Sequence, residues 1–147
     1  MHEFGIYESR NYNYRTLASK LSQIVKARVE PSQLERFAEP QGSEDGHVEI
    51  VPGVLSGCSG RYAREVANAG SPMVFVDRYF AQFLLTLPSG RRILVDSESD
   101  VRKKSPRSVV RYALELLIHN AEKVVIESAT PYSEKVLPFR KASAKSP

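Results

Sequence analysis

The stretch Tyr79–Asp100, YFAQFLLTLPSGRRILVDSESD, predicts two strands joined by a tight turn. Apolar runs flank Pro88-Ser89-Gly90, which supplies a fixed φ and then a residue that tolerates positive φ. The second strand ends in alternating carboxylates, at Asp96, Glu98 and Asp100. Because side chains alternate along a strand, these carboxylates point to one side. They could bind a divalent metal ion or form a solvated end of the strand.

Size and composition indicate one soluble globular domain. The chain has 147 residues, of which 41% are hydrophobic and 26% are charged, so it is long enough for a real core. Its single cysteine, Cys58, rules out an internal disulfide and favours a reducing, cytoplasmic location. No apolar run approaches the roughly 18–20 residues that span a bilayer, and the first residues do not resemble a signal peptide. We therefore expect no membrane partner.

Charge is distributed unevenly between the two parts of the chain. Residues 1–50 contain six Lys/Arg and eight Asp/Glu, a net charge of −2. Residues 51–147 contain fifteen Lys/Arg and nine Asp/Glu, a net charge of +6. This asymmetry points to an anionic partner for the basic part, with nucleic acid as the main candidate; the alternative is a role in solubility alone.

Residues 1–46 are expected to form an N-terminal arm followed by helices. The apolar spacing predicts a helix over about 14–28, and Pro31 suits the first turn of a second, short helix. Tyr12 and Tyr14 lie among arginines, so they could stack on bases or pack against the body of the protein.

Residues 47–137 are expected to form an α/β core, and residues 138–147 a basic, flexible tail. Arg111 and Glu115 are expected to pair on the outer face of a helix. The core elements are expected in the order strand 47–51, helix 60–69, strands 73–77, 83–87 and 91–95, helix 106–119 and strand 123–127. The last strand would lie parallel to 91–95, giving an α+β fold with a mixed central sheet: an antiparallel meander plus one parallel crossover strand, flanked by helices.

Two short motifs carry a family resemblance. The first is Tyr79-Phe80-Ala81-Gln82-Phe83 and the second, after the glycine turn, is Val95-Asp96-Ser97-Glu98. They stand where many nucleases carry Tyr-x-Pro-Asp-Phe and Val-Glu-Val-Lys. Over about residues 60–128 the chain thus resembles the PD-(D/E)XK, or restriction-endonuclease-like, superfamily, including its TnsA-like transposon members.

The resemblance implies an active site with altered residues. In the family, the Asp and Glu bind a metal ion and the Lys helps to activate water; here Gln82, Asp96 and Glu98 occupy these positions. Two of the three have changed chemical type, so a degenerate site without a cofactor is expected. If the protein is active, Mg²⁺ would be the cofactor, and its ligands would come from Asp77, Asp96, Glu98 and Glu65.

Basic residues around these motifs favour contact with DNA phosphates. The candidates are Arg91, Arg92, Arg102, Lys103, Lys104, Arg107 and Arg111. The leading hypothesis is a DNA-binding, nuclease-like protein with a degenerate catalytic centre, acting with protein partners in a DNA-processing, transposition or other mobile-element assembly. One alternative is an active metal-dependent DNA endonuclease. Another is a structural or adaptor protein of phage or mobile-element type, without nucleic-acid chemistry.

Overall fold

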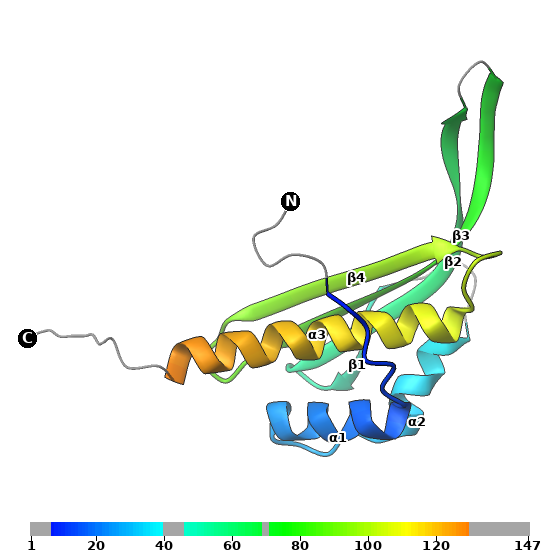
Figure 1. The fold of residues 1–147 in the computed structure, drawn as a ribbon. Helices are drawn as coiled ribbons and strands as arrows, with labels where there is room; N and C mark the ends of the chain where they lie inside the picture. The colour runs from blue at the N-terminus through cyan, green and yellow to red at the C-terminus, as the bar shows by residue number, and fades with distance from the viewer. Residues whose placement is uncertain (1–6, 40–45, 69–70, 130–147) are drawn as a thin grey trace, which may run out of the picture.

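The computed structural model describes residues 7–39, 46–68 and 71–129 (Figure 1). The expected tail at 138–147 therefore lies outside the described residues, as do residues 1–6 and 40–45. The elements, in chain order, are α1 (Tyr14–Val25), α2 (Pro31–Glu35), the short 3₁₀ helix η1 (Arg36–Ala38), β1 (Val48–Val51), β2 (Leu55–Asn68), β3 (Ser71–Thr86), β4 (Arg92–Asp100) and α3 (Pro106–Ala129).

The described strands form an antiparallel sheet in the order β1-β2-β3-β4. The α+β class is confirmed, whereas the expected parallel crossover strand at 123–127 is wrong. Those residues continue α3, because no Gly or Pro interrupts the helix and Leu117, Ala121 and Val124 keep one buried face at helical spacing. The β-branched run that suggested a strand is thus part of a packed helix.

The expected helix at 60–69 is also wrong. Residues 60–66 belong to β2, which pairs with β3 in unbroken register from Leu55 opposite Leu85 to Val66 opposite Val74. The strands expected at 73–77 and 83–87 are two parts of the single strand β3. Cross-strand pairing has overridden the weak local helix preference of the sequence.

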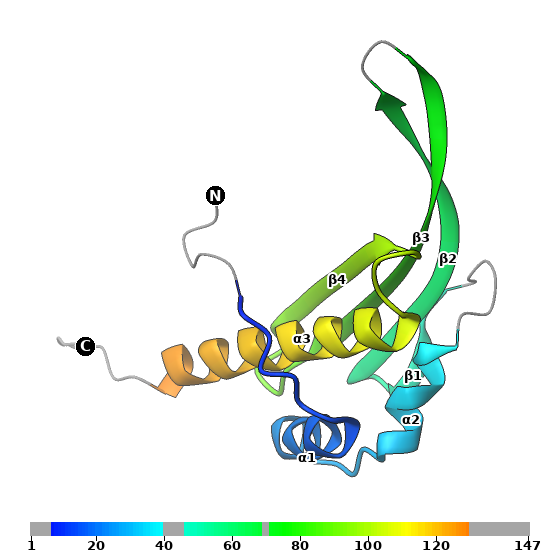
Figure 2. The ribbon, with the colours of Figure 1, turned by 45° about the vertical axis from the view of Figure 1, so that its right-hand side comes forward.

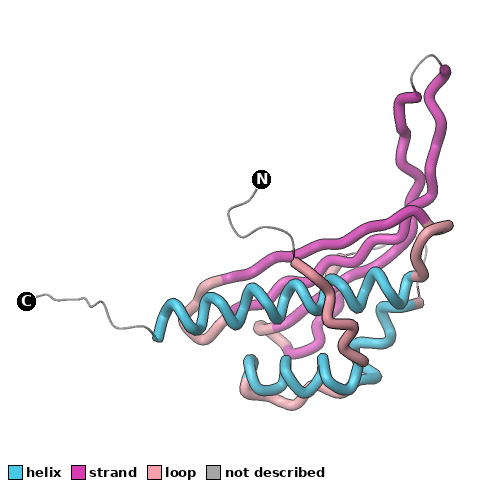
Figure 3. Tube along the Cα trace, in the orientation of Figure 1, coloured by secondary structure: helices cyan, strands magenta, loops and turns pink. Residues whose placement is uncertain are grey.

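All described helices lie on one side of the sheet (Figure 3). The long helix α3 packs against β3 and β4, and α1, α2 and η1 pack beside it. Phe83 is fully buried in this core and meets the ring of Phe37 edge-on, with centroids 5.3 Å apart. Gly57 faces the same ring so closely that an added Cβ would lie 2.4 Å from it.

The predicted N-terminal helices are confirmed and share this core with the sheet. In α1, the Asn13 side chain accepts a hydrogen bond from the Thr16 backbone N–H at 2.8 Å, which caps the helix. Leu17 and Leu21 are buried on one face. The helix ends at Val25 because Lys26 adopts a left-handed φ of 59°.

The segment before α1 crosses over α3 and is held there by Glu115 (Figure 1). Glu115 is fully buried, so the expected outward-facing pair with Arg111 is wrong in its placement, although the two side chains do approach to 3.6 Å. The Glu115 carboxylate accepts hydrogen bonds from the Tyr7 hydroxyl at 2.8 Å, the Ser9 hydroxyl at 3.1 Å, the Arg10 N–H at 2.9 Å and the Tyr12 N–H at 3.0 Å.

The packing interpretation of the tyrosines is confirmed for Tyr14. It is buried, and its hydroxyl donates to the backbone carbonyl of Arg107 at 2.9 Å. Burial raises the pKa of Tyr14 to about 12, and the Arg107 guanidinium lies 4.5 Å from the ring centre. Tyr14 therefore ties the start of α1 to the start of α3.

Within the described ranges, no helix has the length and apolar character needed to cross a bilayer.

The β2–β3 hairpin extends well beyond the rest of the sheet, as both ribbon views show (Figures 1 and 2).

Candidate nucleic-acid interface

The projecting arm consists of residues 63–68 of β2 and residues 71–77 of β3. The arm begins where β4 stops, because Arg78 of β3 is the last residue paired with β4, opposite Asp100. We call the base of this hairpin, together with the adjoining end of β4, the arm root; it comprises Arg61–Arg64, Asp77, Arg78 and residues 98–100. A two-stranded ribbon of this kind is narrow enough to enter the major groove of DNA.

Glu98 connects the arm root to β4. Its carboxylate accepts hydrogen bonds from the Tyr62 hydroxyl at 2.7 Å and from the Arg78 side chain at 2.6 Å, and the Arg64 guanidinium lies 3.4 Å away. The Tyr62 hydrogen bond and the two arginines hold the pKa of Glu98 below its ordinary value. Glu98 is thus a carboxylate engaged with cations from both strands of the hairpin.

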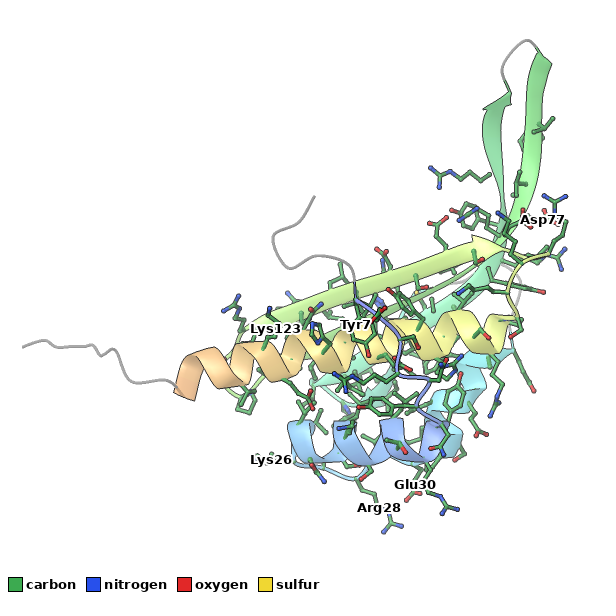
Figure 4. The ribbon with its side chains drawn as sticks, in the orientation of Figure 1. Tyr7, Lys26, Arg28, Glu30, Asp77 and Lys123 are labelled. Carbon is green, nitrogen blue, oxygen red and sulfur yellow. The ribbon has the colours of Figure 1, made fainter. Side chains whose placement is uncertain are left out.

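A second ion pair joins the two strands on the other face of the ribbon. The Arg61 guanidinium lies 2.7 Å from the Asp77 carboxylate, and both side chains are about half exposed. Arg61 also sits over the ring of Tyr79, 5.8 Å from its centre. Asp77 is visible at the base of the arm in Figure 4.

A basic loop leaves β4 directly beside the arm root. The Val101 N–H donates to the Asp77 carbonyl at 3.0 Å, which anchors the loop to β3. The Asp100 carboxylate then accepts the Arg102 N–H at 2.8 Å and pairs with its guanidinium, also at 2.8 Å. These contacts hold the pKa of Asp100 well below its usual range. Lys103 and Lys104 follow; their backbone N–H groups donate to the Asp100 carbonyl, while their exposed side chains make no hydrogen bond or ion pair with the described residues.

The basic residues expected at the interface do not form one cluster. Arg91 and Arg92 lie at the start of β4, at the opposite end of that strand from the loop of Arg102–Lys104. Arg107 pairs with Glu35 at 3.3 Å, and Arg111 reaches toward the buried Glu115. The remaining three, Arg102, Lys103 and Lys104, form the basic loop that adjoins the arm root.

Sequence reasoning missed the arginines that the arm root contributes, Arg61, Arg64 and Arg78. They were overlooked because residues 60–69 were expected to form a helix, in which Arg61 and Arg64 would lie far from Arg78. The available signal was the alternation of Tyr62 and Arg64 with Arg61 and Ala63, which becomes a two-faced strand once the pairing with β3 is known.

The expected catalytic positions lie on the sheet face away from the helices. Gln82 and Asp96 are directly opposite each other in the β3–β4 register, and Glu98 lies two residues further along β4. The Asp96 carboxylate makes no hydrogen bond or ion pair with the described residues, although its backbone belongs to the β3–β4 ladder. Glu98, by contrast, already accepts from Tyr62 and Arg78.

The four expected metal ligands do not converge. By the alternation of the strands, Glu65 and Asp77 point to the helix side of the hairpin, whereas Asp96 and Glu98 point to the other side. Asp77 is also paired with Arg61. The described part of the chain contains no group of three His, Cys, Asp or Glu side chains that could hold a metal ion. These residues do not fit a Mg²⁺ site of the expected kind.

Comparisons of the chain with protein-family models, curated protein sequences and solved structures find no match. The resemblance to PD-(D/E)XK nucleases stays a prediction that these comparisons do not test.

Proposed function

We propose that this protein binds duplex DNA through the arm root and the adjoining basic loop. The observation that carries the proposal is the meeting of Arg61, Arg64 and Arg78 on the hairpin with the Arg102–Lys104 loop at the base of a projecting ribbon. Exposed basic side chains at the base of such a ribbon would contact phosphates on either side of a groove that the ribbon enters.

The ion pairs at the arm root are compatible with this role. Asp77, Glu98 and Asp100 hold the arginines in place, and the guanidinium groups of Arg61, Arg64 and Arg102, which are half exposed or more, keep further donors available. Lys103 and Lys104 are exposed, and their side chains, unlike that of Arg102, form no ion pair with the described residues. They are therefore the best positions at which to test phosphate contact.

We assign no hydrolysis to Gln82, Asp96 and Glu98, because the Glu98 carboxylate already accepts hydrogen bonds from Tyr62 and Arg78 of the hairpin. Asp77 lies on the other face and is paired with Arg61. The active-endonuclease alternative has a direct test, in which supercoiled plasmid is incubated with Mg²⁺. Nicking that disappears in Asp96→Ala would establish that alternative.

DNA binding is tested by fluorescence anisotropy with a short duplex over a series of salt concentrations. We expect the Lys103→Ala, Lys104→Ala double variant to bind about tenfold more weakly than the native chain at low salt. Two lost phosphate contacts reduce the slope of log K against log salt by about 1.8. Binding that is absent even at about 50 mM salt would refute the proposal.

A matched control separates local contact from net charge. The double variant Lys26→Gly, Arg28→Ala also removes two positive charges, but from the end of the molecule that carries α1, far from Asp77 (Figure 4). Glycine is chosen at position 26 because it accepts the left-handed φ of 59° there. The control should bind DNA like the native chain; an equal loss in both double variants would mean that the basic loop beside the arm root is not the contact.

A further inference from the structure

One face of the arm carries an exposed phenylalanine beside a carboxylate. In the β2–β3 register Glu65 lies directly opposite Phe75, so the two side chains point to the same face of the ribbon. Phe75 is 70% exposed, more than any other large apolar side chain of the described residues. Glu65 is also exposed and makes no hydrogen bond or ion pair with the described residues. Neither side chain belongs to the core, so packing of the fold does not account for this pair.

The Glu65–Phe75 pair lies on the same side of the sheet as the basic loop. Side chains alternate along β3, so Phe75 faces the side on which Ala81 and Phe83 are buried under the helices. The loop of Arg102–Lys104 connects β4 to α3 and therefore crosses to this side, next to the base of the arm (Figures 1 and 2). A duplex held by the lysines of this loop would thus meet the face that carries Glu65 and Phe75.

The length of the arm determines how it fits a groove of DNA. From Arg78 to Ser71, the first residue of β3, the strand advances by roughly 23 Å. The major groove is only about 8.5 Å deep, so an arm of this length lies along the groove with one face against the base edges. Phe75 is about 10 Å beyond Arg78, which places it over the bases when the arm root is at the phosphates.

The chemistry of the pair favours the major groove and two particular bases. That groove exposes the methyl group of thymine, an apolar partner for Phe75, and the N4 amino group of cytosine, a donor for the Glu65 carboxylate. Adenine also exposes an amino group there, but its N7 acceptor lies beside it and repels a carboxylate. In the minor groove, A·T pairs present only acceptors, which a carboxylate cannot use.

We infer that Glu65 and Phe75 determine sequence specificity by reading a cytosine and a thymine in the major groove of duplex DNA. The inference rests on the proposed function, because the basic loop and the arm root supply the phosphate contacts that hold the arm in the groove. Cβ atoms of directly opposed residues lie about 5 Å apart and successive base pairs about 3.4 Å apart, so the two bases are within about two base pairs of each other. Glu65 finds a donor at cytosine and repulsive acceptors at other bases, which penalises other sequences.

Selection from a pool of randomised duplexes tests the role of Glu65. The native chain should enrich duplexes in which cytosine and thymine lie within about two base pairs, with cytosine preferred at least about tenfold at its position. Glu65→Gln should shift that preference to adenine, because a glutamine amide pairs with both N6 and N7 of adenine. The matched control Asp96→Asn also removes one exposed negative charge, but from β4, and should retain the preference for cytosine.

Replacement of thymine by uracil in the selected duplex removes only the methyl group and tests the role of Phe75. The native chain should bind about fourfold more weakly when the contacted thymine is replaced, as expected for the loss of one buried methyl group. Phe75→Ala should bind the thymine and uracil duplexes equally. The control Leu94→Ala alters a side chain that is 57% exposed on β4, and it should keep the difference between the two duplexes.

The outcomes separate base reading from DNA binding. A native chain that binds the pool with a steep salt dependence but enriches no sequence would overturn the inference and leave the proposed function intact. A sequence preference that persists in both Glu65→Gln and Phe75→Ala would also overturn it, because other residues would then read the bases. Binding that is absent even at low salt would refute the proposed function, and this inference with it.

Discussion

Replacing Glu115 with Gln should destabilise the protein at neutral pH although the change is nearly isosteric. The carboxylate is fully buried and accepts from two hydroxyls and from the N–H groups of Arg10 and Tyr12. Burial raises the pKa of Glu115, but these hydrogen bonds outweigh burial and leave it below the ordinary value of 4.5. The folded protein therefore favours the charged form, which Gln cannot supply.

The hydrogen bonds of the two carboxylate oxygens determine how much stability Glu115→Gln loses. One carboxylate oxygen receives Tyr7, Ser9 and Arg10, and a Gln carbonyl in that place would keep all three bonds. The other oxygen receives the Tyr12 N–H at 3.0 Å and lies 3.6 Å from Arg111, so the Gln amide would point a donor at two donors. One unsatisfied N–H and a lost charge correspond to about 1–3 kcal/mol.

Urea unfolding at pH 7 measures this difference, with Glu122→Gln as the control. Glu122 lies on the same helix but is half exposed, in a 3.9 Å pair with Lys20, and should change stability by less than about 0.5 kcal/mol. Hydrogen exchange at the Tyr12 amide should accelerate in Glu115→Gln and not in the control, since the opening of the segment before α1 becomes easier.

The pH dependence of the stability difference tests whether the charge on Glu115 is responsible. Because the folded pKa of Glu115 is depressed, its contribution is complete above the unfolded value of 4.5 and is lost as the pH falls through the folded pKa. The gap between the native chain and Glu115→Gln should therefore narrow below about pH 4.5. A gap that stays constant down to acidic pH, or no gap at pH 7, would show that the charge on Glu115 does not hold the segment.

Two further substitutions probe the sheet. Gly57→Ala should lower the free energy of unfolding in urea by about 1–3 kcal/mol, because its Cβ would lie 2.4 Å from the buried Phe83 ring. The neighbouring Ser56→Ala, on the other face of the strand, should leave stability nearly unchanged. A Gly57→Ala variant as stable as the native chain would mean that the ring has room to move. Glu98→Gln should make trypsin cleave the arm root faster, because it weakens the contacts that join the hairpin to β4. The control Asp96→Asn should leave the cleavage rate unchanged. Equal cleavage rates in the two variants would contradict the anchoring role of Glu98.

The sequence was informative where local chemistry determines the structure. The apolar spacing predicted α1, Pro31 marks the start of α2, and Pro88-Ser89-Gly90 marks the turn between β3 and β4, in which Gly90 has a φ of 92°. These features act over a few residues, so they can be read without knowing what packs against them.

The sequence was misleading where contacts between distant residues determine the structure. Residues 60–68 carry no strong strand pattern, and they extend as β2 because β3 provides a partner for each residue up to Val66. Glu115 has the spacing of an exposed helical ion pair with Arg111, and it is buried because a segment about a hundred residues earlier in the chain lies over it. Neither neighbour can be inferred from spacing along the chain.

The three alternating carboxylates of β4 show how a partner strand divides one sequence pattern into separate roles. Asp96 lies opposite Gln82 and stays free of cations among the described residues. Glu98 lies one step closer to the hairpin, where Tyr62 and Arg78 reach it, and Asp100 receives the loop that begins with Arg102. A metal site would require carboxylates that lack cationic partners and face one another. Since arginines from β2, β3 and the following loop neutralise two of the three, the same pattern instead joins the hairpin to β4 and holds the basic loop beside it.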